Sequence, residues 1–134
     1  MTPARRATFA ALAAVLIPGD GVMPSAGEAD VAGWLLDKAL RASPVLAGPL
    51  ADLLDELAGE PAEVAVPRLE YERPAALDLL LLAVAGAYLL DPRVRDLLGY
   101  HGQEAEVLPR GGFGGEDFLE ALMERGPRWR EAPP

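Results

Sequence analysis

The chain has 134 residues, 51% of them hydrophobic, and a formal net charge of −9. This length predicts a single domain with a hydrophobic core, and the acidic excess, which holds in both halves, argues against a nucleic-acid-binding surface. Because the sequence contains no cysteine, disulfide bonds, thiolate metal sites and cysteine nucleophiles are excluded.

The N-terminal segment predicts a helix that ends at Pro18. Thr2 is a favourable N-cap residue, and Pro3 suits the first helical position. Apolar residues then recur on one helical face, at Phe9, Leu12 and Leu16.

Two further helices are expected before residue 58. Ser25 and Glu28 have the spacing of a capping box and predict a helix to about Arg41, with Val31, Trp34 and Leu35 facing inward. Ser43-Pro44 opens the next helix. Its leucines follow a helical period: Leu46, Leu50, Leu53, Leu54 and Leu57.

The stretch Gly59 to Arg73 contains Pro61, Pro67 and four glutamates. Proline inside a helix removes a backbone donor and clashes with the preceding turn. We therefore expect a connector with at most one or two helical turns.

The most apolar helix is expected to begin at Pro74, and from Leu79 to Leu90 it has no polar face. A helix that is apolar on every side is typically surrounded by other elements, which places Leu81, Leu82 and Tyr88 inside the protein.

Asp91-Pro92 repeats the combination of cap and proline, and predicts a short helix that carries Val94, Leu97 and Leu98. Gly99 is expected to end this helix in the left-handed conformation. A last helix is predicted from about Glu116 to Glu124, with Phe118, Leu119, Leu122 and Met123 on one face.

No segment alternates as a strand does, so the predicted fold is all-α. We expect a compact bundle of about five to seven short helices around one apolar central helix. Residues 1–124 form the predicted helical domain, and residues 125–134 form a C-terminal tail.

Two segments have the outline of targeting or membrane elements. Arg5-Arg6 precedes an apolar run, as in a twin-arginine signal, but the run ends early at Ile17. The run Leu79 to Leu90 is shorter than the roughly 20 residues that span a bilayer. We expect neither a cleaved signal nor direct membrane insertion.

The sequence offers no catalytic constellation. His101 is the single histidine and has no orienting partner nearby, and the carboxylates follow no metal-binding spacing. The glycine-rich segment 110–115 follows no strand and precedes Glu116-Asp117, which would repel phosphate. We therefore predict no catalytic, cofactor-binding or metal-binding residue, and an isolated chain without enzyme activity.

Two features are candidates for binding a partner protein. In the turn around Tyr100 and His101, the aromatic side chain either closes the core or projects toward a partner. The tail combines arginine and tryptophan, which are enriched in binding hot spots, but it could equally be a solvated terminus. The candidate partner-binding residues are Tyr100, His101, Arg125, Arg128, Trp129 and Arg130.

Three segments carry a family likeness. They are the helix from Phe9 into Ile17-Pro18 with its Pro24-Ser25-Ala26 restart, the stretch Ala87 to Gln103, and Arg125-Gly126-Pro127. Together they resemble the gluconate 2-dehydrogenase subunit 3 family, over about half of the positions. His101 stands where the family's Gly-Tyr-Pro-Gly turn has proline.

The resemblance implies an all-helical accessory subunit that binds a large FAD-dependent oxidoreductase of the glucose-methanol-choline (GMC) type and assists its maturation. FAD is then expected in the partner, not in this chain. Some family members carry a twin-arginine signal and take the partner across the membrane, so the implied location is cytoplasmic, or periplasmic after export with the partner. The alternative is a helical interaction or regulatory module without an oxidoreductase partner.

Overall fold

The computed structural model describes residues 1–100, Gly102 and residues 123–125. Internal contacts divide the chain into Met1–His101, called unit 1 below, and Gly102–Pro134. Each unit is described by itself. The boundary predicted after residue 124 falls inside the second unit, of which the structure describes Gly102 and a helical turn at 123–125.

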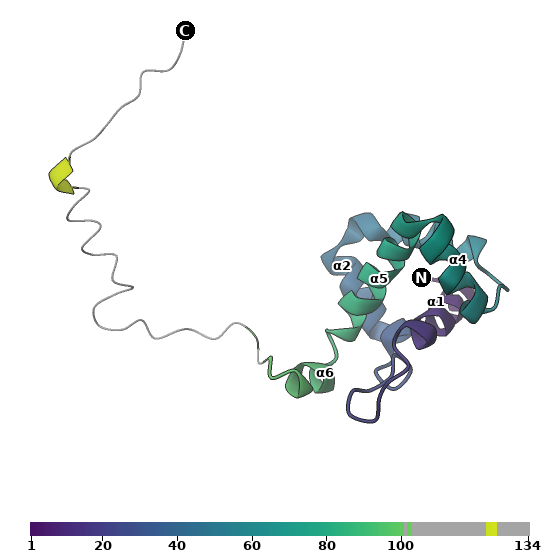
Figure 1. Ribbon diagram of the computed structural model, residues 1–134, viewed down its shortest axis with the longest axis horizontal. Coiled ribbons are helices and arrows are strands. Elements are labelled where there is room, and N and C mark those ends of the chain that lie inside the picture. Colours follow the sequence, from purple (N-terminus) through teal and green to yellow (C-terminus); the bar gives the residue numbers. More distant parts are fainter. Residues whose placement is uncertain (101, 103–122, 126–134) are drawn as a thin grey trace, which may run out of the picture. The chain divides into compact units, whose positions relative to one another are not determined.

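Unit 1 is built from α-helices and two short helical turns, and the described residues include no strand, which confirms the all-α prediction. In chain order the elements are α1 (Pro3–Leu16), η1 (Val31–Leu35), α2 (Leu36–Ala42), η2 (Pro44–Leu46), α3 (Ala47–Glu56), α4 (Ala62–Glu72), α5 (Pro74–Tyr88) and α6 (Pro92–Leu97) (Figure 1).

The first helix begins and packs as predicted. Thr2 Oγ1 accepts a hydrogen bond from the Arg5 backbone N–H at 3.3 Å, and Phe9 and Leu12 are buried. Helix α1 packs against α3, α4 and η1. The Arg5-Arg6 pair is part of this packing, because Arg5 forms an ion pair with Asp55 at 2.6 Å and Arg6 with Asp37 at 2.7 Å.

Helix α5 is the central element, as expected, and contacts α2, α3, α4 and η1. Its buried residues are Leu80, Ala83, Val84, Ala87 and Tyr88. The prediction was wrong for Leu81 and Leu82, which are 40% and 59% exposed. One apolar side of α5 is left uncovered by the other described elements.

The connector predicted between Gly59 and Arg73 is instead the helix α4. Its buried residues recur with helical spacing, at Ala62, Ala65, Val66 and Leu69. Pro67 lies on the exposed side, so the Glu63 carbonyl that loses its donor faces water, which limits the cost of a proline inside a helix. Ion pairs from Arg68 to Glu60 and from Arg73 to Glu56 hold the two ends of α4.

Trp34 was predicted to face inward, but it is 56% exposed. The cause is a break in the helix, since Asp30 is left-handed (φ 49°) and Gly33 has φ −83° and ψ −135°. A Cβ on Gly33 would come within 2.2 Å of an Asp30 carboxylate oxygen, so any larger residue there would have to displace the exposed Asp30 side chain. Leu35 and Leu36 turn inward after this break, and Lys38 Nζ lies 5.5 Å from the Trp34 ring centroid.

The helix predicted after Ser43-Pro44 corresponds to η2 and α3. Leu50, Leu53, Leu54 and Leu57 are buried, as predicted. Ser43 precedes η2 without making a side-chain capping hydrogen bond.

Within the part of the chain that the structure describes, none of the helices combines the length and the apolar character that crossing a membrane requires.

Candidate interaction surface

Asp91 connects α5 to α6. Its buried carboxylate accepts a hydrogen bond from the Arg93 backbone N–H at 2.8 Å, which caps α6 as the sequence predicts. The same carboxylate forms an ion pair with the Arg93 guanidinium at 2.7 Å. Hydrogen bonding to Arg93 holds the pKa of Asp91 below its usual value, although burial acts in the opposite direction.

Two long-range hydrogen bonds attach this junction to the loop between α1 and η1. Arg93 Nη2 donates to the Glu28 carbonyl oxygen at 2.6 Å, and the Tyr88 hydroxyl donates to the Pro24 carbonyl oxygen at 2.6 Å. The Tyr88 hydroxyl is protonated and able to donate at neutral pH, and burial raises its pKa further above the ordinary tyrosine value. The predicted position of Tyr88 in or near the core is confirmed.

The loop itself is ordered by the predicted capping box. The Ser25 backbone N–H donates to Glu28 Oε2 at 2.7 Å, and the Glu28 backbone N–H donates to Ser25 Oγ at 3.2 Å. The hydrogen bond from Ser25 holds the pKa of Glu28 below its usual value. The carbonyl groups that receive Tyr88 and Arg93 therefore belong to a fixed segment of backbone.

Helix α6 ends in a left-handed cap, as predicted for Gly99 (φ 67°). The Gly99 N–H donates to the Asp96 carbonyl at 3.0 Å, and the Tyr100 N–H donates to the Arg95 carbonyl at 2.9 Å. This pair of bonds is a Schellman motif, which brings the residue after the glycine back against the last turn of the helix. The motif fixes the Tyr100 backbone beside Arg95.

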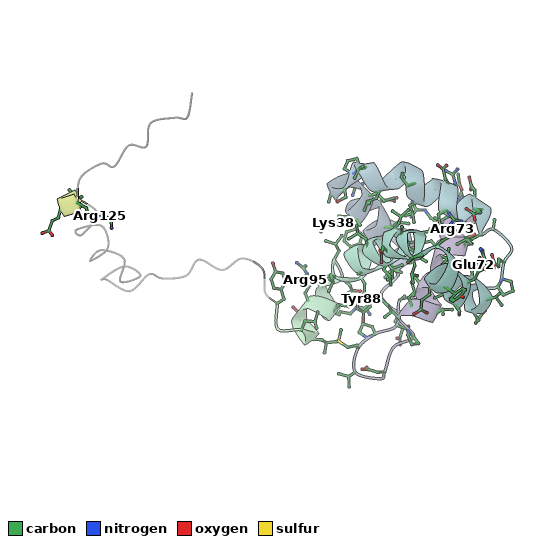
Figure 2. All side chains as sticks on the ribbon, turned by 45° about the horizontal axis from the view of Figure 1, so that its top comes forward. Lys38, Glu72, Arg73, Tyr88, Arg95 and Arg125 are labelled. Carbon is green, nitrogen blue, oxygen red and sulfur yellow. The ribbon has the colours of Figure 1, made fainter. Side chains whose placement is uncertain are left out.

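A hollow of about 260 Å³ lies at this end of α6, lined by Leu89, Arg95, Leu98 and Tyr100. We call it the α6 hollow. Leu89, Leu98 and Tyr100 are 49%, 55% and 54% exposed. Helix α6 lies beyond the end of α5, outside the group formed by α1, α2, α4 and α5 (Figure 1), and Arg95 lies on it at the edge of the unit (Figure 2).

A second apolar groove, of about 180 Å³, lies between α2, η2 and α5. Its lining comprises Ala39, Leu40, Ala42, Ser43, Leu46, Leu82, Ala83, Gly86 and Leu90. No charged side chain contributes to this lining, so the groove offers apolar contact without a group that would orient a ligand.

Of the six predicted partner-binding residues, the structure describes Tyr100 and Arg125. Tyr100 is exposed and lines the α6 hollow, so it projects from the core instead of closing it. Arg125 is exposed in the second unit. The other four predicted residues, His101, Arg128, Trp129 and Arg130, lie outside the described residues, as does most of the helix predicted at 116–124.

Sequence reasoning did not select Leu89, Arg95 or Leu98. Leu98 was expected on the apolar side of α6, and the tight turn at Gly99 was the available signal that residues on either side of it meet.

The described residues contain no group of three or more His, Asp or Glu side chains placed to hold a metal ion. The arrangement suits recognition of an apolar group next to an anionic one.

Comparisons with known proteins returned no relative: no protein-family model matches the chain, and no curated protein or solved structure matches it.

Proposed function

We propose that this chain is a non-catalytic accessory subunit that binds a FAD-dependent oxidoreductase of the GMC type and helps it to mature or remain stable. FAD belongs to the partner in this proposal, and the complex is cytoplasmic, or periplasmic if the two proteins are exported together. The observation that carries the proposal is the α6 hollow, an exposed apolar site with a neighbouring arginine on a firmly held helix end.

The position of this site supports the family resemblance. The stretch Ala87 to Gln103, which carries the strongest likeness, contains all four residues that line the α6 hollow. The second stretch, Phe9 to Val31, is joined to it by the hydrogen bonds from Tyr88 to Pro24 and from Arg93 to Glu28. Two of the stretches that carry the resemblance are thus in contact within unit 1, next to the α6 hollow.

The proposal is tested by searching the genes beside that of this chain for a GMC-type oxidoreductase and co-expressing the full chain with it. We expect the two proteins to co-purify, and the oxidoreductase to contain more FAD per polypeptide than when it is expressed alone. Absorbance at flavin wavelengths, relative to protein concentration, measures the difference.

Separate elution, together with equal yield and equal FAD content in the presence and absence of the chain, would contradict the proposal. The chain would then be assigned to the alternative class, a helical interaction or regulatory module with a different partner.

A further inference from the structure

The α6 hollow has the size and lining of a site for one large side chain. Cofactor and drug-sized ligands occupy sites of roughly 300–1,000 Å³, above the 260 Å³ of this hollow. Single exposed apolar residues are ordinary on protein surfaces, but here Leu89, Leu98 and Tyr100 gather around one concavity. Such a concavity fits a leucine or aromatic side chain of another polypeptide.

Arg95 supplies a charge at the rim of this apolar site. Several other described arginines, among them Arg68 and Arg93, have carboxylate partners, whereas no described carboxylate pairs with Arg95. Its Nε is buried and has no hydrogen-bond acceptor among the described residues. Because a buried N–H without an acceptor is unfavourable, a carboxylate that reaches this guanidinium as the Arg95 side chain turns toward it forms a favourable charge-assisted hydrogen bond.

Charge complementarity favours an acidic group over a basic one beside Arg95. The chain carries a net charge of −9, so an acidic segment is repelled by most of its surface. Near the hollow, the Asp91 carboxylate is buried and already paired with Arg93, which leaves the Arg95 charge uncompensated by it. Exposed Asp96 lies next to Arg95 on α6, so the attraction of an acidic partner comes from the Arg95 guanidinium itself and not from a broad positive surface.

We propose that the α6 hollow binds an acidic, apolar peptide segment of the partner, with a large apolar side chain in the hollow and an adjacent carboxylate on Arg95. The site is preorganised, since the Schellman motif fixes Tyr100 and the Asp91–Arg93 pair holds α6 against the loop. Preorganisation reduces the entropy lost on binding. The proposed function supplies the identity of the partner, but the chemistry of the site stands without it.

The first experiment measures the site directly. The full ¹⁵N-labelled chain is titrated with the peptide acetyl-Glu-Leu-Phe-Glu-amide and with its glutamine analogue, and the Arg95 Nε–H and the Tyr100 backbone amide are followed by NMR. We expect both signals to shift with the acidic peptide, and about tenfold weaker binding of the analogue.

Two variants provide the controls. Arg95→Gln should bind both peptides equally weakly, whereas Arg41→Gln, which removes an exposed arginine that also has no described carboxylate partner, should leave the preference for the acidic peptide unchanged. Unmoved Arg95 and Tyr100 signals, or equal binding of the two peptides, would overturn the proposal. Shifts that depend on protein concentration without peptide would also overturn it, because they identify a second copy as the occupant.

The second experiment separates the site from the proposed function. In complexes with the GMC-type oxidoreductase, Arg95→Gln and Leu98→Ser should each raise the dissociation constant about tenfold, while Arg41→Gln should not. Equal affinity of all variants overturns the site and leaves the proposed function intact. Peptide binding at the hollow without oxidoreductase binding overturns the proposed function and supports the site.

Discussion

Asp91 combines three contacts in one side chain: it caps α6, forms an ion pair with Arg93 and lies in the buried region between α5 and α6. Through Arg93 it also fixes the hydrogen bond to the Glu28 carbonyl. Together with buried Val94, this carboxylate holds α6, and so the α6 hollow, in place.

Replacing Asp91 with alanine should lower the free energy of unfolding by about 1–2 kcal/mol at pH 7, the usual cost of losing an N-cap acceptor. Urea unfolding measures the loss. Asp78→Ala, at an exposed position of α5, serves as the control and should change stability by less than about 0.5 kcal/mol.

The effect of Asp91→Ala should also depend on pH. The pKa of Asp91 is lowered in the folded protein, so its stabilising contribution is complete above the unfolded value of about 4 and disappears as the pH falls through the folded value. The difference in unfolding free energy between wild type and variant should therefore shrink below about pH 4. A difference that stays constant from neutral to acidic pH would show that Asp91 acts only by packing.

At the scale of elements, sequence patterns predicted α1 and α6 because each begins with a cap and a proline and carries regular apolar spacing. Helix α5 was predicted because it begins with a proline and is apolar on every side. Helix α4 was missed because Pro67 and the glutamates outweighed a correct apolar period, although the proline lies on the exposed side. Which side of a helix faces outward is a tertiary property that local sequence does not contain.

The same reason limits prediction of the candidate site. Tyr100 was identified from its turn, since glycine at a helix end reverses the chain by local geometry alone. Leu89 and Arg95 lie beside Tyr100 because the chain turns between α5 and α6, and the loop that holds this junction, through Tyr88 to Pro24 and Arg93 to Glu28, lies more than sixty positions away along the chain. Trp34 is exposed, against the prediction, for a comparable reason: the backbone breaks at Gly33, and the helical spacing of apolar residues gives no sign of this break.

The two sides of α5 should respond differently to truncation. Leu80 is fully buried, so Leu80→Ala should cost about 2–5 kcal/mol, because it removes apolar contact and leaves a cavity. Leu82 lies on the exposed side, and Leu82→Ala should cost less than about 0.5 kcal/mol. Urea unfolding of the matched pair tests the orientation of α5, and equal losses would mean that both sides are covered.

The end of α6 should be sensitive to the loss of its glycine. Gly99 has φ 67°, so Gly99→Ala should destabilise the protein by about 1 kcal/mol and weaken partner binding by displacing Tyr100. Gly48 lies inside α3 with open space where a Cβ would go, so Gly48→Ala should instead be neutral or stabilising. Thermal melting distinguishes the two, and an unchanged melting temperature of Gly99→Ala would mean that the left-handed turn does not need a glycine.

At the scale of the whole molecule, the described core belongs to unit 1: its buried apolar residues run from Phe9 to Val94. The chain thus separates the residues that hold the fold from two groups of predicted partner contacts. One group lines the α6 hollow, and the other is Arg125 with the tail residues Arg128, Trp129 and Arg130.

Truncation after Glu124 tests whether the second group contributes. The core cluster is untouched, so the melting temperature should stay within about 2 °C of the full chain. Arginine and tryptophan dominate binding hot spots, so removing residues 125–134 should weaken the proposed complex with an oxidoreductase about tenfold or more.

Combining this truncation with Arg95→Gln decides whether the two regions act separately. Contacts without shared partners contribute additively, so the combined variant should lose the sum of the two binding free energies. Titration calorimetry of the four proteins measures this cycle. If the truncated chain binds as tightly as the full one, the tail takes no part in the interface and recognition is confined to unit 1. Of the two changes, Arg95→Gln should then cause the larger loss of binding free energy.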